Sequence, residues 1–158
     1  MQLTRFTDLG LRILMHLATP AGASGTTTSA VAEQMAFSPT HAAKVVSRLQ
    51  GLGLVETRRG RTGGLTITPA GRTASVGWIA RQLEGPGEVI NCEGERPCPL
   101  ARGCRLRGLV REAKEAFFAV LDPWTVDELA AASTGDVLLS IGIGPPADPT
   151  TPRSTGPR

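Results

Sequence analysis

The stretch Ser38-Pro-Thr-His-Ala-Ala-Lys-Val-Val-Ser-Arg-Leu-Gln-Gly-Leu52 decides the fold of this 158-residue chain. Its serine is a favoured N-cap residue, and its proline suits the first helical position. Apolar residues then recur at the i, i+3, i+4, i+7 spacing of an amphipathic helix, at Ala42, Val45, Val46, Leu49 and Leu52. The stretch therefore predicts a helix with one buried face and one polar face.

The elements on both sides place this helix in a winged helix-turn-helix. Before it, apolar spacing predicts a helix over residues 4–18 and a short helix capped by Thr28 or Ser29. After it, two short strands flank the glycine- and arginine-rich turn 58–64. Two helices joined by a tight turn and followed by a basic hairpin are typical of DNA-binding proteins, in which the second helix enters the major groove.

Charge supports a role for this segment in binding double-stranded DNA. Residues 40–72 carry six basic side chains and one acid, whereas the formal net charge of the whole chain is only +3. A basic segment matches the phosphate backbone of DNA, although it is also compatible with a merely solvated face. The residues expected to contact DNA come from the helix start, its polar face and the hairpin: Ser38, Thr40, His41, Lys44, Ser47, Arg48, Arg58, Arg59 and Arg61.

All three cysteines, Cys92, Cys98 and Cys104, lie in one Gly/Pro/Arg-rich stretch, with five residues between neighbours. An odd number leaves one thiol outside any disulfide scheme. Structural zinc sites usually use closer cysteine pairs and four protein ligands, whereas these longer spacers are able to surround an iron-sulfur cluster. The spacing favours a cluster over zinc, and redox-active or incidental thiols are the third interpretation.

A second half of the chain follows the winged helix. A weaker helical pattern over residues 73–83 leads into the cysteine stretch, and beyond Cys104 apolar residues recur every three or four positions up to Leu121. This stripe fits a helix packed on its own domain or a dimerisation helix, and the small core elsewhere favours dimerisation. We expect a mainly α fold with a small β-wing, divided into a DNA-binding winged helix-turn-helix (1–72), the cysteine loop with a long dimerisation helix (73–135) and a flexible tail (136–158).

The same sequence argues against other classes of protein. The apolar stretch over residues 9–18 is interrupted by Arg12 and His16, so neither secretion nor membrane insertion is expected, and the predicted location is the cytoplasm. An enzyme with a cysteine nucleophile needs a nearby base, yet the only histidines, His16 and His41, belong to other predicted helices. We therefore expect a regulator and not an enzyme.

Four motifs together resemble the Rrf-type winged-helix regulators: the opening Met-Gln-Leu-Thr-Arg-Phe-Thr-Asp (1–8), the helix from Ser38, the wing Arg-Gly-Arg-Thr-Gly-Gly-Leu (59–65) and the Cys-x5-Cys-x5-Cys loop. The resemblance implies a homodimer crossed by the helix after the cysteines, a palindromic operator and an iron-sulfur cluster whose state controls DNA affinity. The opening and the short spacers are most similar to the nitric-oxide-sensing members. The implied function is a repressor released when nitric oxide reacts with the cluster; the alternatives are a redox or cluster-status sensor and a zinc- or thiol-based repressor.

The resemblance also bears on the ligands of the cluster. Some members use a histidine three residues beyond the last cysteine, and here that position is Arg107. Similarity to the nitric-oxide sensors instead implies Asp8 of the partner subunit as the fourth ligand, although a helix-start carboxylate also pairs readily with Arg12 or Arg5. The implied cofactor is a 4Fe-4S cluster, or alternatively 2Fe-2S, bound by Cys92, Cys98, Cys104 and Asp8, with Arg12, Arg96, Arg102, Arg105 and Arg107 available to offset its charge.

Overall fold

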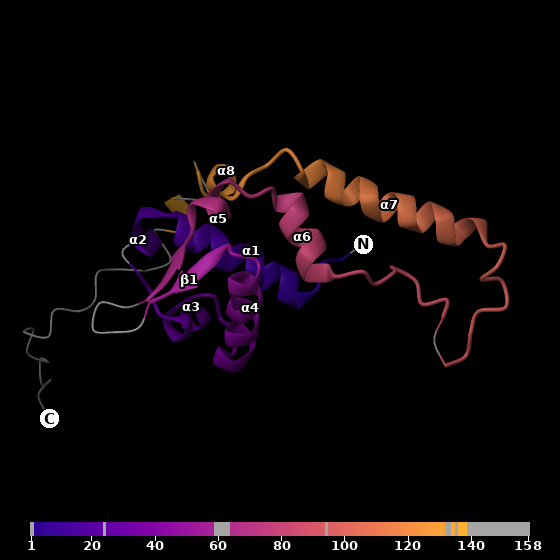
Figure 1. The fold of residues 1–158 in the computed structure, drawn as a ribbon, viewed down its shortest axis with the longest axis horizontal. Helices are drawn as coiled ribbons and strands as arrows, with labels where there is room; N and C mark the ends of the chain where they lie inside the picture. Colours follow the sequence, from indigo (N-terminus) through magenta and orange to yellow (C-terminus); the bar gives the residue numbers. More distant parts are fainter. Residues whose placement is uncertain are drawn as a thin grey trace, which may run out of the picture.

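The computed structural model describes residues 2–23, 25–58, 64–93, 95–131, 134 and 136–138. Its elements are α1 (Arg5–Ala18), α2 (Pro20–Ala23), α3 (Thr28–Gln34), α4 (Pro39–Gly51), β1 (Val55–Thr57), β2 (Leu65–Ile67), α5 (Pro69–Thr73), α6 (Val76–Glu84), α7 (Arg105–Leu121) and α8 (Val126–Ala130). Figure 1 shows helices and strands gathered around α1, with α7 extending away from them to one side. The segment between α6 and α7 runs beneath α7 to its far end, where that helix begins.

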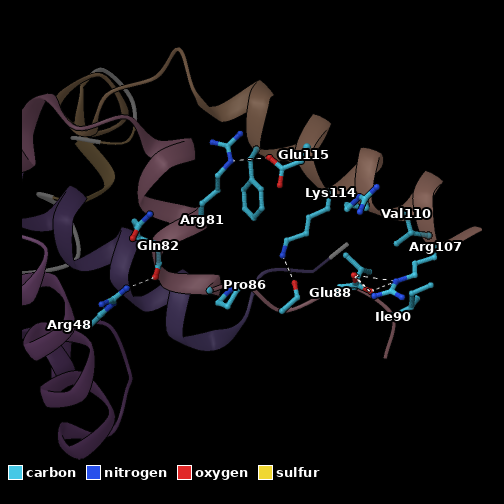
Figure 2. Close-up of a pocket in the computed structure, with 15 residues that line it drawn as sticks. Arg48, Arg81, Gln82, Pro86, Glu88, Ile90, Arg107, Val110, Lys114 and Glu115 are labelled. Carbon is cyan, nitrogen blue, oxygen red and sulfur yellow. Dashed lines mark hydrogen bonds and ion pairs between the residues drawn. The ribbon is translucent and has the colours of Figure 1, made fainter. Parts of the chain in front are cut away.

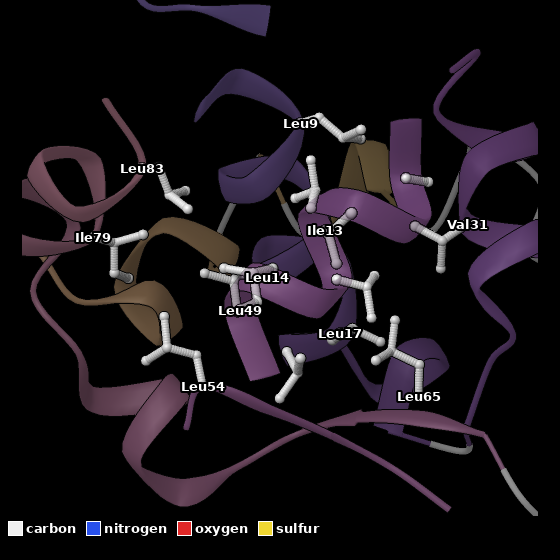
Figure 3. Close-up of a cluster of buried hydrophobic side chains, with 14 of the residues drawn as sticks. Leu9, Ile13, Leu14, Leu17, Val31, Leu49, Leu54, Leu65, Ile79 and Leu83 are labelled. Atoms are coloured by element: carbon white, nitrogen blue, oxygen red, sulfur yellow. The ribbon is translucent and has the colours of Figure 1, made fainter. Parts of the chain in front are cut away.

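Helix α1 forms the centre of the core because one of its sides is apolar at every turn. Leu9, Ile13, Leu14 and Leu17 are completely buried, and the helix contacts α4, α6 and α8. Figure 3 shows these side chains meeting residues of the other helices and of β2. Burying one such side chain stabilises the fold by about 1.5–3 kcal/mol, so α1 ties the elements of the winged helix together.

The helix-turn-helix consists of α3, a short turn and α4. The Thr27 hydroxyl caps α3 by accepting from the backbone N–H of Ala30 at 3.1 Å, so the predicted caps Thr28 and Ser29 are wrong, by one and two residues. Ala36 has a φ of 57°, a left-handed conformation that turns the chain sharply. Ser38 then caps α4 with Pro39 in its first turn, which confirms the predicted start of this helix.

The wing is a two-stranded antiparallel sheet, as predicted. Val55 pairs with Ile67 and Thr57 pairs with Leu65. Thr26, in front of α3, adds an isolated bridge: its backbone carbonyl accepts from the N–H of Leu65 at 2.6 Å. The wing is thereby attached to the helix-turn-helix on one side. Its tip, residues 59–63, lies outside the described residues.

The helix predicted over residues 73–83 is α6, which begins three residues later than predicted, and the short helix α5 before it was not predicted. Helix α5 ends at Thr73, Ala74 is extended, and the Ser75 hydroxyl caps α6 by accepting from the N–H of Trp78 at 3.2 Å. Helices α6 and α7 approach closely at Gly77, where an added Cβ would lie 2.1 Å from Asp122 Oδ1. Only glycine fits this contact, which fixes the C-terminal end of α7 against α6.

The architecture confirms a mainly α fold with a small β-wing. The single-turn helix α2, between α1 and α3, was not predicted from the sequence. Within the part of the chain that the structure describes, no helix combines the length and apolar character needed to cross a membrane. The predicted tail (136–158) lies outside this part from residue 139 on, and Leu138, within its described first three residues, is buried.

Candidate DNA-binding face and cluster loop

The polar face of α4 is open to solvent over most of its length. Thr40, Lys44, Ser47 and Arg48 are all exposed, which confirms that they point away from the core. Lys44 forms no hydrogen bond or ion pair with any described residue, so its ammonium group is available to a phosphate. Ser38, at the start of the helix, already uses its hydroxyl to accept from the N–H of His41 at 3.3 Å.

Arg48 differs from Lys44 because it is attached to another helix. Its Nη2 donates to the backbone carbonyl of Gln82 at 3.0 Å. Gln82 lies near the end of α6, immediately before the cysteine loop, and Figure 2 shows the two side by side. An exposed arginine has more donors than this one bond uses, so Arg48 is able to contact DNA while it remains linked to α6.

His41 does not point outward, and the prediction of its orientation is wrong. It is half-buried, with its ring centre 6.2 Å from that of Phe6 and 6.4 Å from that of Phe37. Its Nε2 atom is buried without a hydrogen-bond partner among the described residues. The cause is packing by α1 and by the turn before α4, which helical periodicity within α4 alone does not reveal.

The wing contributes one described arginine. Arg58 is exposed and forms an ion pair of 3.2 Å with Glu56, while its backbone N–H donates to the carbonyl of Gly64 across the hairpin at 2.9 Å. An exposed pair of this kind is weak and breaks readily in favour of a phosphate. Arg59 and Arg61, the other predicted contacts of the wing, lie outside the described residues.

The cysteine loop keeps its three thiols free and close in the chain. Cys92 is buried, whereas Cys98 and Cys104 are half-buried. The N–H groups of Cys98, Ala101 and Gly103 donate to the carbonyls of Cys92, Cys98 and Leu100 at 3.1, 3.0 and 3.1 Å, so backbone turns fold the loop. Burial raises the pKa of the Cys92 thiol; the nearby Cys98 acts in the same direction and Arg107 in the opposite one.

These turns do not by themselves assemble a metal site. Across the described ranges, no three His, Cys, Asp or Glu side chains lie in an arrangement that would hold a metal ion. Three free thiols are nevertheless a suitable donor set for iron or zinc, because thiolates prefer such metals. The loop would have to close around a bound metal group.

The arginines near the cysteines fall into two groups. Arg96, Arg102 and Arg105 are exposed and have no hydrogen bond or ion pair with described residues. Arg107 is instead fully engaged with the carboxylates of Glu88 and Glu93. Neither glutamate was among the predicted site residues; the available signal was an acid directly after Cys92, another acid shortly before it, and an arginine in the first turn after Cys104.

Asp8 and Arg12 form an ion pair on the surface of α1, with Oδ1 and Nε 2.8 Å apart. Both side chains are well exposed. The guanidinium of Arg12 also lies 6.0 Å from the centre of the Phe37 ring, the ring that contacts His41. Within one subunit, Asp8 therefore has the helix-start role that the sequence allowed.

Helix α7 presents an apolar stripe to solvent. Leu106 is 58%, Leu109 62% and Val120 70% exposed, and Phe118 is the one buried residue of the helix. The C-terminal end of α7 is held by Arg81, which donates to both carboxylate oxygens of Asp122 at 2.6 and 3.0 Å. No described residue covers the stripe, so within the described ranges α7 is anchored at one end and unpartnered along its outer face.

Comparison with known proteins points to transcription regulators. The Rrf2 family model, described as an iron-dependent transcriptional regulator, matches residues 3–132. The transcriptional repressor NsrR of Streptomyces coelicolor is 57% identical over 142 residues, covering 89% of this chain and 96% of that protein. The transcriptional regulator NsrR of Shouchella clausii is 35% identical over 131 residues, covering 82% and 88%. The structure of CymR, the global cysteine regulator of B. subtilis, matches with a TM-score of 0.60 at 29% identity, covering 82% of this chain and 96% of that one.

Proposed function

The chain belongs to the Rrf2 family of iron-dependent transcriptional regulators, and from that premise we propose that it binds a palindromic operator as a homodimer and leaves it when nitric oxide reacts with an iron-sulfur cluster on the cysteine loop. It is a transcriptional repressor of the type named NsrR, and not an enzyme. The observation that carries the proposal is the conjunction of this relationship with three free thiols in one loop. As with other DNA-bound repressors, we place it in the cytoplasm.

The donor set of the loop supports the cluster. Cys92, Cys98 and Cys104 supply three thiolates, which leaves one ligand of a 4Fe-4S cluster to another group. When bound, such a cluster supplies iron that reacts with nitric oxide. The buried position of Cys92 and the half-buried positions of the other two keep the site partly shielded from water. A 2Fe-2S cluster is the alternative with the same ligands.

Asp8 of the partner subunit is the fourth ligand in this proposal. Among the described residues its exposed carboxylate is bonded only to Arg12 of its own helix, so a partner's loop is able to reach it. Arg12 would hold the carboxylate whenever the cluster does not. The Asp8 carboxylate would then have two alternative partners: Arg12 of its own helix, or the cluster on the partner's loop.

A second copy of the chain is the proposed partner of the apolar stripe on α7. Three large apolar side chains with exposures of 58–70% on one helix are unusual in a monomer and typical of an uncovered interface. The rigid attachment of α7 through Arg81 and Asp122 would transmit its position to the rest of the subunit. Two α7 helices crossing along this stripe would place the two α4 helices on one side of the dimer, for half-sites about 34 Å apart.

Contacts around α4 support a route from Asp8 to the DNA-binding face. Arg12 is paired with Asp8 and lies over the ring of Phe37, and Phe37 is next to His41 in the first turn of α4. Moving the carboxylate away from Arg12 changes the charge beside this ring cluster. Coupling of about 1–3 kcal/mol between cluster state and DNA would be sufficient for roughly a 5–150-fold change in affinity.

A zinc- or thiol-based repressor is the second candidate, because three free thiols suit zinc or thiol oxidation as well as a cluster. Absorption spectra of anaerobically purified protein distinguish the two, because a cluster is coloured and zinc is not. We expect a brown protein whose colour is lost in each of Cys92→Ala, Cys98→Ala and Cys104→Ala, while the dimer remains folded. A colourless wild type containing zinc, or full colour in any one variant, would overturn the proposal.

A further inference from the structure

Arg107 joins the first turn of α7 to two carboxylates of the cysteine loop. Its Nε and Nη2 donate to the two oxygens of Glu88, each at 2.9 Å, and Nη2 also donates to Glu93 Oε1 at 2.7 Å. Figure 2 shows the guanidinium of Arg107 facing Glu88 across the gap between α7 and the loop. A planar guanidinium with two bonds to one carboxylate fixes direction as well as distance.

The two glutamates lie on either side of Cys92 in the chain, and Glu93 is its direct neighbour. Cys104 is the N-cap residue of α7, and Arg107 lies in the turn that follows it. A single side chain therefore links the backbone around the first cysteine to the helix that begins at the third. The thiol of Cys104 takes no part in capping α7, so it remains available as a ligand.

Few other hydrogen bonds join this loop to helical side chains. Among the described residues, the hydrogen bonds from residues 86–104 to helical side chains are those of Arg107 and one from Lys114 to the carbonyl of Gly87. The remaining hydrogen bonds of the loop among the described residues form internal turns. Without Arg107, the bond from Lys114 to Gly87 would be the one remaining hydrogen bond between this loop and a helical side chain among the described residues.

We propose that Arg107 is a positioning residue that holds the Cys92 and Cys104 segments together before the cluster is bound. This inference rests on the proposed cluster function and adds a role that the three cysteines alone do not supply. Closing a pre-ordered loop costs less conformational entropy than closing a free one. Residues that orient metal ligands typically change metal affinity by roughly 10–100-fold, and Arg107 is expected to fall in this range.

The first test uses protein without the cluster, so that it is independent of cofactor loading. Hydrogen exchange of the loop peptide over residues 86–104 is compared in wild type, Arg107→Gln and Arg105→Gln. Arg105 is the matched control, because it lies in the same turn of α7 but has no bond to a described residue. We expect exchange on the order of two- to fivefold faster in Arg107→Gln only, as suits the loss of exposed ion pairs. Equal exchange in all three proteins would overturn the proposed positioning role of Arg107.

The second test measures the loss of cluster absorbance to an iron chelator after anaerobic reconstitution. We expect loss roughly tenfold faster in Arg107→Gln than in Arg105→Gln. Adding Glu88→Gln to Arg107→Gln should cause little further change, because the two act through one contact. Wild type without a chromophore would refute the proposed function itself. Wild type with a chromophore, together with equal loss in both variants, would refute only the role of Arg107.

Discussion

The guanidinium of Arg48 donates to the backbone carbonyl of Gln82 at 3.0 Å, which joins the outer face of α4 to the end of α6. Gly85, with a φ of 71°, ends α6 three residues later and begins the segment that carries the cysteines. The helix proposed to read DNA and the loop proposed to hold the cluster are therefore connected through one side chain. Lys44, one turn earlier on α4, has no such connection among the described residues.

Arg48→Ala and Lys44→Ala should consequently have different effects on DNA affinity in the cluster-loaded and cluster-free protein. Lys44→Ala is expected to weaken binding to a selected duplex equally with and without the cluster, and to lower the salt slope by about one unit, as the loss of one phosphate contact requires. Arg48→Ala should in addition reduce the ratio of the two affinities, because it breaks the link to α6. Anisotropy titrations of both states at several salt concentrations measure this. An unchanged ratio in Arg48→Ala would mean that the link carries no coupling.

Leu109→Glu should convert the dimer to monomers. The side chain is 62% exposed on the outer stripe of α7, so a charge there leaves the subunit folded but places an unpaired carboxylate in the proposed interface. The dissociation constant of the dimer should rise about 30-fold, which corresponds to a loss of roughly 2 kcal/mol or more in the free energy of association. Leu109→Met is the matched control and should remain dimeric. Sedimentation profiles that are identical for the two variants would place the dimer interface elsewhere.

Asp8→Ala should retain a cluster, since three thiolates remain and water or an added thiol fills the fourth position. Its iron-ligand vibrational spectrum should nevertheless differ from wild type, and DNA affinity should depend less on cluster state. Arg12→Gln separates the two roles of the carboxylate, because it removes the pair seen within one subunit while leaving the ligand in place. If the spectra of Asp8→Ala and Asp8→Cys matched wild type, Asp8 would be only a helix-start carboxylate.

His16 should make the fold sensitive to acid. It is completely buried in α1, neither ring nitrogen has a hydrogen-bond partner among the described residues, and burial lowers its pKa below the ordinary value of 6.5. The unfolded chain therefore binds a proton more readily than the folded one. The contribution of His16 to the free energy of unfolding is fully present above about pH 6.5. It falls as the pH drops toward the lower pKa of the folded chain, by up to about 1.4 kcal/mol per pH unit.

His16→Leu provides the comparison for this effect. The substitution replaces two unsatisfied polar atoms with an apolar side chain, which is compatible with a stable core. The difference between the urea unfolding free energies of His16→Leu and wild type should move in favour of the variant between pH 8 and pH 5.5. A difference that stays constant over this range would show that His16 does not titrate differently in the folded and unfolded chains.

The sequence predicted those elements whose determinants are local. Helix α4 follows from Ser38, Pro39 and an apolar period within one stretch, and the wing follows from two apolar strands around a glycine-rich turn. The orientation of His41 did not follow, because the rings that cover it come from α1 and from the preceding turn. Packing between elements is a tertiary property that periodicity in one element does not contain.

The candidate site shows the same division. Three cysteines in one stretch were sufficient to predict a loop that gathers three free thiols, and the apolar stripe was sufficient to predict α7. The partners of Arg107 were missed, since Glu88 and Glu93 lie 19 and 14 residues away in the chain and are brought to it by the path of the loop. The bond from Arg48 to Gln82 spans 34 residues and was missed for the same reason.

The most direct test of regulation by the cluster is an anaerobic titration of nitric oxide into cluster-loaded protein bound to a fluorescent duplex selected from random sequences. Cluster absorbance and DNA anisotropy are recorded together, and Cys98→Ala protein at a concentration that gives some DNA binding serves as the control. We expect anisotropy to fall in step with the loss of cluster absorbance, to an affinity roughly 5–150-fold weaker, and no response in the control. DNA that stays bound after the cluster absorbance has disappeared would contradict a nitric-oxide-released repressor.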